Sequence, residues 1–151
     1  MSLGWEQSAD GVFRCRLPFL DVTVGLICGR DGVVLIDSGS TLPEARAIAG
    51  DVHSMACRAV SHIVLTHHHF DHILGASAFK TPEIYCAPQV GVTMAKRNDH
   101  LRADALRYGA DTGRGGPWHR CAARASAPPS TTSAIGRSRS AIPVAAIPTT
   151  T

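Results

Sequence analysis

Three consecutive histidines, followed by a further aspartate and histidine, stand directly after a short apolar segment of this 151-residue chain. The segment runs Thr66-His67-His68-His69-Phe70-Asp71-His72 and follows Ile63-Val64-Leu65. In an extended backbone, residues i and i+2 point to the same side, so His67 and His69 can bind one ion together. Asp71 and His72 come next, at a predicted helix start, where they can hold a second ion.

The ligand types in this segment indicate which metal it would bind. Imidazole and carboxylate ligands without thiolates suit zinc or iron, in a site that keeps water in its coordination shell. Such a site is catalytic rather than structural. The alternative is a histidine-rich surface loop or a capped helix start with solvated side chains. The position of the segment, directly after an apolar strand, favours the metal site.

The rest of residues 1–111 predicts mixed α/β layers. Alternating apolar and polar residues, or continuous apolar runs, predict strands over 11–17, 22–28, 33–36, 63–65 and 84–86. The strand over 33–36 is continuously apolar, so we expect it to be covered on both faces. Thr41 and Glu44 have capping-box spacing, with Pro43 between them, so a helix should follow. A last helix is expected over about 88–107, and its predicted inner-face residues are Val92, Ala95, Leu101, Ala105 and Leu106.

Taken together, these motifs resemble the metallo-β-lactamase-fold hydrolases. Thr66 to His72 is similar to the T-H-x-H-x-D-H signature of that family, and Val34-Leu35-Ile36-Asp37-Ser38-Gly39 resembles the strand and turn that precede it. Gly75 stands where the family often carries glycine. The resemblance covers about residues 10–110 and implies an αββα sandwich, of which this part is the N-terminal half.

The resemblance also implies roles for individual residues. His67 and His69 would bind a first zinc ion, Asp71 and His72 a second one, and His68 would be a spacer. Asp37 would lie behind the ligands and orient them. For Asp37 the alternative is a turn aspartate that caps its own backbone.

The implied chemistry is hydrolysis of a small-molecule substrate. Two metal ions would activate a bridging water, and the metal-bound hydroxide would attack a carbonyl-type ester, thioester or amide bond. Asp71 would be the catalytic residue that both binds a metal and orients the hydroxide.

Composition changes abruptly near residue 111. All twelve acidic residues lie at or before Asp111, whereas residues 112–151 contain five arginines and no acid. This predicts a domain over 1–111 and a low-complexity, basic and disordered tail over 112–151. The arginines of the tail are too dispersed, and too poor in aromatic neighbours, to predict a nucleic-acid-binding segment.

The remaining histidines do not complete the family pattern. After His72 only His100 and His119 remain, and neither stands in the Gly-His turn that the family carries downstream. We therefore expect a truncated or frameshifted member whose incomplete sheet favours self-association. Three outcomes stay open: a competent enzyme completed by another chain, an inactive member that binds at most one metal weakly, and a polyanion binder acting through the tail.

Three features that the sequence lacks predict the cellular location of the protein. There is no apolar run of the roughly 18–20 residues that a membrane span needs, and no secretory signal at the start. The five cysteines are scattered and form no C-x-x-C pair. The expectation is a cytoplasmic protein with reduced thiols and no membrane partner.

Overall fold

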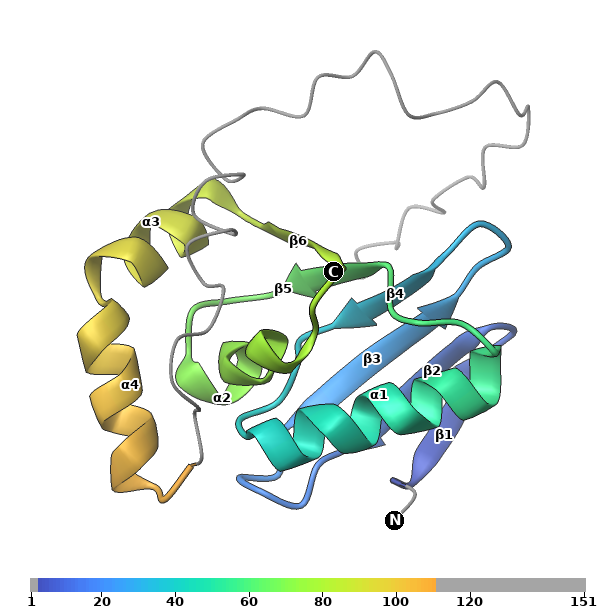
Figure 1. Ribbon diagram of the computed structural model, residues 1–151, viewed down its shortest axis with the longest axis horizontal. Coiled ribbons are helices and arrows are strands. Elements are labelled where there is room, and N and C mark those ends of the chain that lie inside the picture. Colours follow the sequence, from blue (N-terminus) through green and yellow to red (C-terminus); the bar gives the residue numbers. More distant parts are fainter. Residues whose placement is uncertain (1–2, 111–151) are drawn as a thin grey trace, which may run out of the picture.

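A single six-stranded sheet organises residues 3–110, the part of the chain that this computed structural model describes (Figure 1). The strands follow one another in chain order across the sheet: β1 (Trp5–Ala9), β2 (Val12–Arg16), β3 (Thr23–Cys28), β4 (Val33–Ile36), β5 (His62–Leu65) and β6 (Glu83–Cys86). β1 to β4 are antiparallel neighbours, whereas β4, β5 and β6 run parallel.

The helices are α1 (Leu42–Ala56), α2 (Phe70–Ile73), the 3-10 turn η1 (Leu74–Ala78), α3 (Pro88–Lys96) and α4 (Asn98–Arg107). The mixed α/β architecture is therefore confirmed. No helix within residues 3–110 is both long and apolar enough to span a membrane. The predicted tail over 112–151, with His119, lies outside the described residues.

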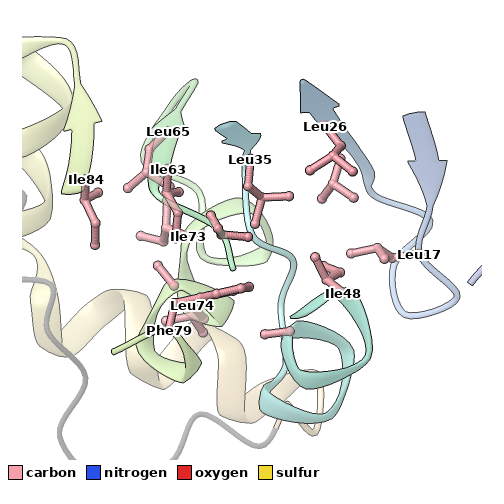
Figure 2. Packing of buried hydrophobic residues seen from close by; sticks show 14 of the residues in the cluster. Leu17, Leu26, Leu35, Ile48, Ile63, Leu65, Ile73, Leu74, Phe79 and Ile84 are labelled. Atoms are coloured by element: carbon pink, nitrogen blue, oxygen red, sulfur yellow. The ribbon is translucent and has the colours of Figure 1, made fainter. Parts of the chain in front are cut away.

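One face of the sheet carries the core. Neighbouring strands contribute Leu26, Leu35, Ile63 and Ile84 side by side, and Figure 2 shows them facing the helices. Ile48 and Val52 of α1 and Leu74 of η1 complete this layer, and each is at most 1% exposed. Full burial of each large side chain stabilises the fold by about 1.5–3 kcal/mol, so this layer holds α1 and η1 against the sheet.

The opposite face of the sheet is only partly covered by the described residues. Cross-strand register places Ile27 beside Val34, and Val64 beside Tyr85, on this face. Ile27, Val64 and Tyr85 are 38%, 36% and 42% exposed. The expectation that β4 is covered on both faces is therefore met only in part, since Val34 and Ile36 are half-buried. Self-association through this face stays a prediction.

Helix α1 begins where the capping-box spacing predicts. Thr41 is its N-cap, and the Thr41 hydroxyl accepts a hydrogen bond from the Glu44 backbone N–H at 3.2 Å. The Glu44 carboxylate in turn accepts from the Ser40 N–H at 3.4 Å and from the Phe19 N–H at 3.0 Å. Glu44 thus ties the start of α1 to the β2–β3 connection.

The prediction of one helix over 88–107 is wrong, because the chain breaks at Arg97. Arg97 has φ −113° and ψ 18°, outside helical geometry, and ends α3 before α4 begins. The break rotates the two apolar stripes relative to each other. Leu101 and Ala105 are buried as predicted, but Val92, Ala95 and Leu106 are exposed, and Val90 and Met94 take the inner face of α3. Strand β1 was also not predicted, and the strand expected over 11–17 is limited to Val12–Arg16.

Gly75 lies where η1 crosses the segment after β4. A Cβ atom at Gly75 would lie 1.9 Å from the Ser38 carbonyl oxygen, far inside van der Waals contact. The Gly75 N–H also donates to the Gly39 carbonyl at 2.9 Å. Only glycine therefore allows η1 and the Ser38–Ser40 segment to approach this closely.

Replacing Gly75 with alanine should strongly destabilise the fold, because backbone must move to admit the methyl group. We expect Gly75→Ala to lower the free energy of unfolding by about 3 kcal/mol or more. Gly50→Ala is the matched control, since Gly50 lies within α1 with open space around its Cβ position. That variant should gain about 0.5–1 kcal/mol. Denaturant unfolding followed by circular dichroism measures both, and equal effects of the two variants would contradict the close contact.

Candidate metal centre

The candidate site lies at the edge of the sheet where β4 and β5 end. These strands are parallel neighbours, so their carboxyl ends meet, and ligands in open α/β sheets bind at this kind of edge. Asp37 follows β4, and Thr66 and His67 follow β5. The Asp37 N–H donates to the Val64 carbonyl at 2.8 Å, which continues the pairing of the strands up to the site.

The turn after Asp37 is tied to α2. Both the N–H and the hydroxyl of Ser38 donate to the His72 carbonyl, at 2.8 Å and 3.0 Å. The Ser40 hydroxyl donates to the Asp71 carbonyl at 3.2 Å. The backbone of Asp71 and His72 is thereby held against the end of β4, so their side chains start from a restrained position.

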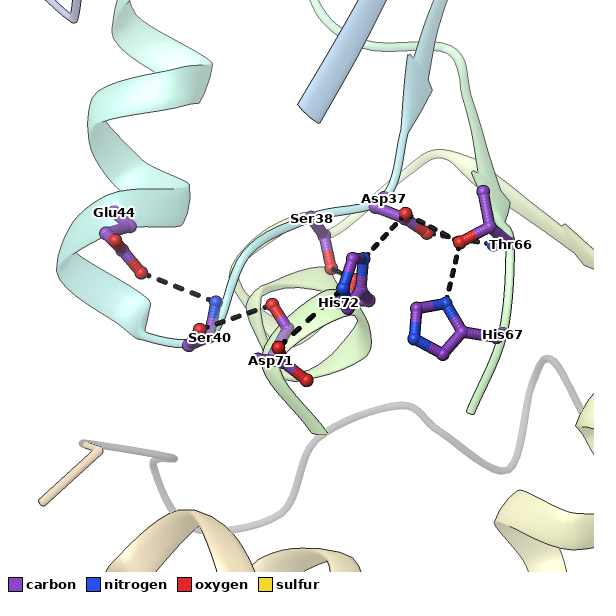
Figure 3. A network of polar contacts seen from close by, with 8 residues as sticks. All are labelled: Asp37, Ser38, Ser40, Glu44, Thr66, His67, Asp71 and His72. Carbon is purple, nitrogen blue, oxygen red and sulfur yellow. Dashed lines mark hydrogen bonds and ion pairs between the residues drawn. The ribbon is translucent and has the colours of Figure 1, made fainter. Parts of the chain in front are cut away.

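Asp37 is buried, at 4% exposure, and its carboxylate accepts three hydrogen bonds (Figure 3). Oδ1 accepts from the Thr66 N–H at 2.8 Å. Oδ2 accepts from the Thr66 hydroxyl at 2.7 Å and pairs with Nδ1 of His72 at 2.8 Å. Its partners therefore come from other segments, and not from its own turn. Asp37 has φ 58°, a left-handed conformation that the surrounding hydrogen bonds hold in place.

These bonds determine which ring nitrogens are free. An ionised Asp37 carboxylate only accepts, so a neutral His72 ring would donate through Nδ1–H and carry its lone pair on Nε2. The Thr66 hydroxyl gives its single proton to Asp37, and so it must accept from Nδ1–H of His67, 2.9 Å away. Nε2 of His67 is then also unprotonated. Two imidazole lone pairs are thus available for a metal.

His67 is the histidine whose protonation the surroundings affect most clearly. Burial, and then the neighbouring imidazoles of His72 and His69, lower the pKa of His67 below its ordinary value. The ring is therefore neutral at pH 7, the form that a metal requires.

The side chains of the predicted ligands lie near one another. The ring of His67 lies 4.1 Å from that of His72 and 4.7 Å from that of His69, between centroids. The nearer Asp71 oxygen lies 3.7 Å from Nε2 of His72. His68, the predicted spacer, has its ring 5.3 Å from that of His69.

Ligand atoms of Asp37, His67 and His72 lie within 4.8 Å of one another, a spacing that a metal ion could bridge. The hydrogen bonds argue for a different assignment, because both Asp37 oxygens are already engaged by donors. Asp37 is better placed to orient His72 from behind, as histidine ligands commonly require. The assignment of His67, His69, Asp71 and His72 as metal ligands stays a prediction.

A cavity of about 680 Å³ adjoins this opening. His69 and Asp71 form part of its wall, and Arg97, Arg107 and Tyr108 form another part. Sequence reasoning missed these three residues, and also the Thr66 hydroxyl that orients His67. The sequence signal for Thr66 is its place as the first residue of the T-H-x-H-x-D-H pattern, which gives it no role of its own.

Comparison with known proteins decides the family. The model of the metallo-β-lactamase superfamily matches residues 17–127, more than half of the chain. The chain belongs to the metallo-β-lactamase superfamily. Among curated proteins none matches it.

Solved metallo-β-lactamases share its fold. The mono-zinc form of FIM-1 from Pseudomonas aeruginosa is 16% identical, with a TM-score of 0.51 over 74% of this chain and 48% of that one. The enzyme from Erythrobacter litoralis is 18% identical, with a TM-score of 0.53 over 76% of this chain and 50% of that one. The enzyme from Hirschia baltica is 15% identical, with a TM-score of 0.50 over 76% and 51%. The chain therefore spans about half the length of these superfamily members.

The tautomers in this superfamily member can be tested directly. We expect nitrogen-15 imidazole NMR of metal-free protein to show His67 and His72 protonated at Nδ1. Thr66→Val removes the hydroxyl acceptor, so Nε2-protonated His67 should become populated, whereas Thr66→Ser keeps the hydroxyl and the tautomer. An Nε2-protonated His67 in the wild-type chain, or identical spectra for the two variants, would contradict this hydrogen-bond assignment.

Proposed function

We propose that this chain is a zinc-dependent hydrolase whose metal ligands are His67, His69, Asp71 and His72. The observation that carries the proposal is the orientation of His67 and His72. Asp37 and Thr66 bind their Nδ1 atoms, and the two rings, with centroids 4.1 Å apart, keep their Nε2 atoms for a metal. Membership of the metallo-β-lactamase superfamily supports metal-dependent hydrolysis as the reaction class.

The donor set fits zinc. Imidazole nitrogens and a carboxylate are common ligands of catalytic zinc, which needs an open position for water. No cysteine belongs to the cluster of candidate ligands among residues 3–110. Cys15 is buried in the core, where burial raises the pKa of its thiol, so it is a packing residue.

The residues around the proposed zinc ion would have different roles. Zinc, when bound, supplies the Lewis acidity that makes a water molecule nucleophilic near neutral pH. Asp71 lies at the rim of the cluster and also lines the cavity, so it would orient that water toward a substrate. Asp37 would hold the His72 ring and increase its basicity. Ser38 and Ser40 would keep α2 in register with the sheet edge.

A carbonyl-type ester, thioester or amide is the proposed substrate bond. A metal-activated water attacks such carbonyls, and the solved structures that share this fold are metallo-β-lactamases by title. The number of metal ions is a separate question. FIM-1 is known in a mono-zinc form, and one ion shared by His67 and His72 is the stoichiometry that we propose here.

A second candidate is metal binding without turnover. Support for it comes from the described ligands, because residues 3–110 hold a single group of candidate metal ligands. Both candidate functions predict zinc binding, but only the first predicts hydrolysis. Zinc content and hydrolysis must therefore both be measured.

Zinc binding should depend on the histidine cluster. We expect wild-type protein, dialysed against zinc and then buffer, to retain at least one zinc ion per chain by elemental analysis. His67→Ala and His69→Ala should each remove nitrogen ligands and lose most of it. His53→Ala is the control, since His53 is exposed on α1 outside the cluster. Wild-type protein without zinc, or equal loss in all three variants, would overturn the ligand assignment.

Hydrolysis should depend on the Asp71 carboxylate. Asp71→Asn keeps the size of the side chain but removes its charge, so kcat/KM should fall by about 10²-fold or more. A panel of thioester, lactone and β-lactam substrates measures this, with zinc content determined on the same samples. Asp99→Asn, an exposed carboxylate on α4, is the control. A zinc-loaded wild-type chain that hydrolyses none of the panel would favour the second candidate.

A further inference from the structure

The cavity beside the metal centre has two chemically different walls. One wall contains His69 and Asp71, two of the proposed metal ligands. The other comes from the α3–α4 junction and α4, and it includes Arg97 and Arg107. The volume of about 680 Å³ lies within the roughly 300–1,000 Å³ of small-molecule sites. A molecule in this cavity would touch the metal ligands and the two arginines at once.

The arginines of this wall have little competing carboxylate nearby. Arg107 pairs with Asp104 at 3.5 Å, with side chains 77% and 41% exposed, so water weakens the pair. Arg97 has no ion pair with any residue in the described part of the chain. Its side chain emerges where the helix breaks, and the Leu101 N–H binds its carbonyl at 2.9 Å. The backbone of Arg97 is fixed, while its guanidinium is available.

The charge of the cavity depends on whether a metal is bound. Arg97 and Arg107 offset the lining carboxylates Asp71 and Asp104, so the cavity is close to neutral when no metal is bound. A divalent cation held by Asp71 would leave the cavity with a net positive charge. Guanidinium groups bind carboxylates through paired hydrogen bonds, which gives directional as well as electrostatic recognition.

Apolar side chains also line the cavity. The rings of Phe70 and Tyr108 stack with centroids 5.5 Å apart and planes 28° from parallel. Leu101 adds a further apolar contribution to the lining. This surface suits an aromatic or alkyl body that places one polar end at the arginines and the other at the metal ligands.

We propose that Arg97 and Arg107 bind a carboxylate group of the substrate, so that the preferred substrates are acids with an apolar body. This inference rests on the proposed hydrolase function for the position of the scissile bond. The carboxylate lies at the α4 wall, the apolar body contacts Phe70 and Tyr108, and the carbonyl to be hydrolysed faces Asp71. Arg97 and Arg107 are specificity-determining residues in this arrangement.

A matched pair of probe ligands tests the proposal on the full chain. Phenylacetate and phenylacetamide share their shape and differ in charge, and ligand-detected NMR titration gives their affinities. We expect metal-free protein to bind the acid about 10-fold more tightly than the amide, the effect of one charged hydrogen-bonded contact. Zinc-loaded protein should show a larger preference for the acid.

Side-chain variants locate the site. Arg97→Gln should lower the affinity for phenylacetate by about 10-fold and leave phenylacetamide unchanged. Arg107→Gln should act in the same direction. Arg46→Gln, on the exposed side of α1 and outside the cavity lining, should change neither. Circular dichroism checks that the exposed substitutions leave the fold intact.

The outcomes separate this proposal from the function on which it rests. Equal affinities for acid and amide in metal-free protein, or acid binding that Arg97→Gln leaves unchanged, would overturn the carboxylate site. Failure to bind zinc would overturn the proposed hydrolase. Acid selectivity that depends on Arg97 in metal-free protein would support the carboxylate site even then.

Discussion

The buried carboxylate of Asp37 joins the three segments that make up the site. It accepts hydrogen bonds from the Thr66 backbone and hydroxyl and from the His72 ring, and so connects the ends of β4 and β5 with α2. A buried carboxylate is costly unless donors surround it, and here all its partners belong to the site. Removing the histidine segment would leave this charge without partners. The stability of the sheet edge and the orientation of the ligands therefore depend on the same group.

Close packing makes this arrangement possible. Gly75 lets η1 approach the Ser38 carbonyl, and the Ser38 and Ser40 side chains then reach the carbonyl groups of α2. Without that approach the His72 ring would lie farther from Asp37. Gly75 thus affects the site by letting the backbone of η1 lie close to Ser38. A methyl group at Gly75 would move this backbone and so displace the proposed metal ligands.

Local signals predicted much of the fold, and contacts between distant segments account for what was missed. The Thr41–Glu44 cap and the apolar strand before His67 are short-range patterns, and both are present as predicted. The helix break at Arg97 was missed because no glycine or proline stands at that position. The tautomer of His67 depends on Asp37, 30 positions earlier in the chain. Sequence patterns predicted candidate ligands because these stand together in the chain, but they could not place Arg107 at the same cavity as His69 and Asp71.

Asp71 is a proposed metal ligand that also lines the cavity, so metal binding and anion binding would be interdependent. Its carboxylate faces His72 on one side and lines the cavity on the other. While no metal is bound, its charge opposes an anion near Arg97 and Arg107. A metal ion held by Asp71 offsets this charge and strengthens anion binding, and by thermodynamic linkage a bound anion strengthens metal binding by the same factor. An acidic substrate would therefore help to retain the metal in a site of few ligands.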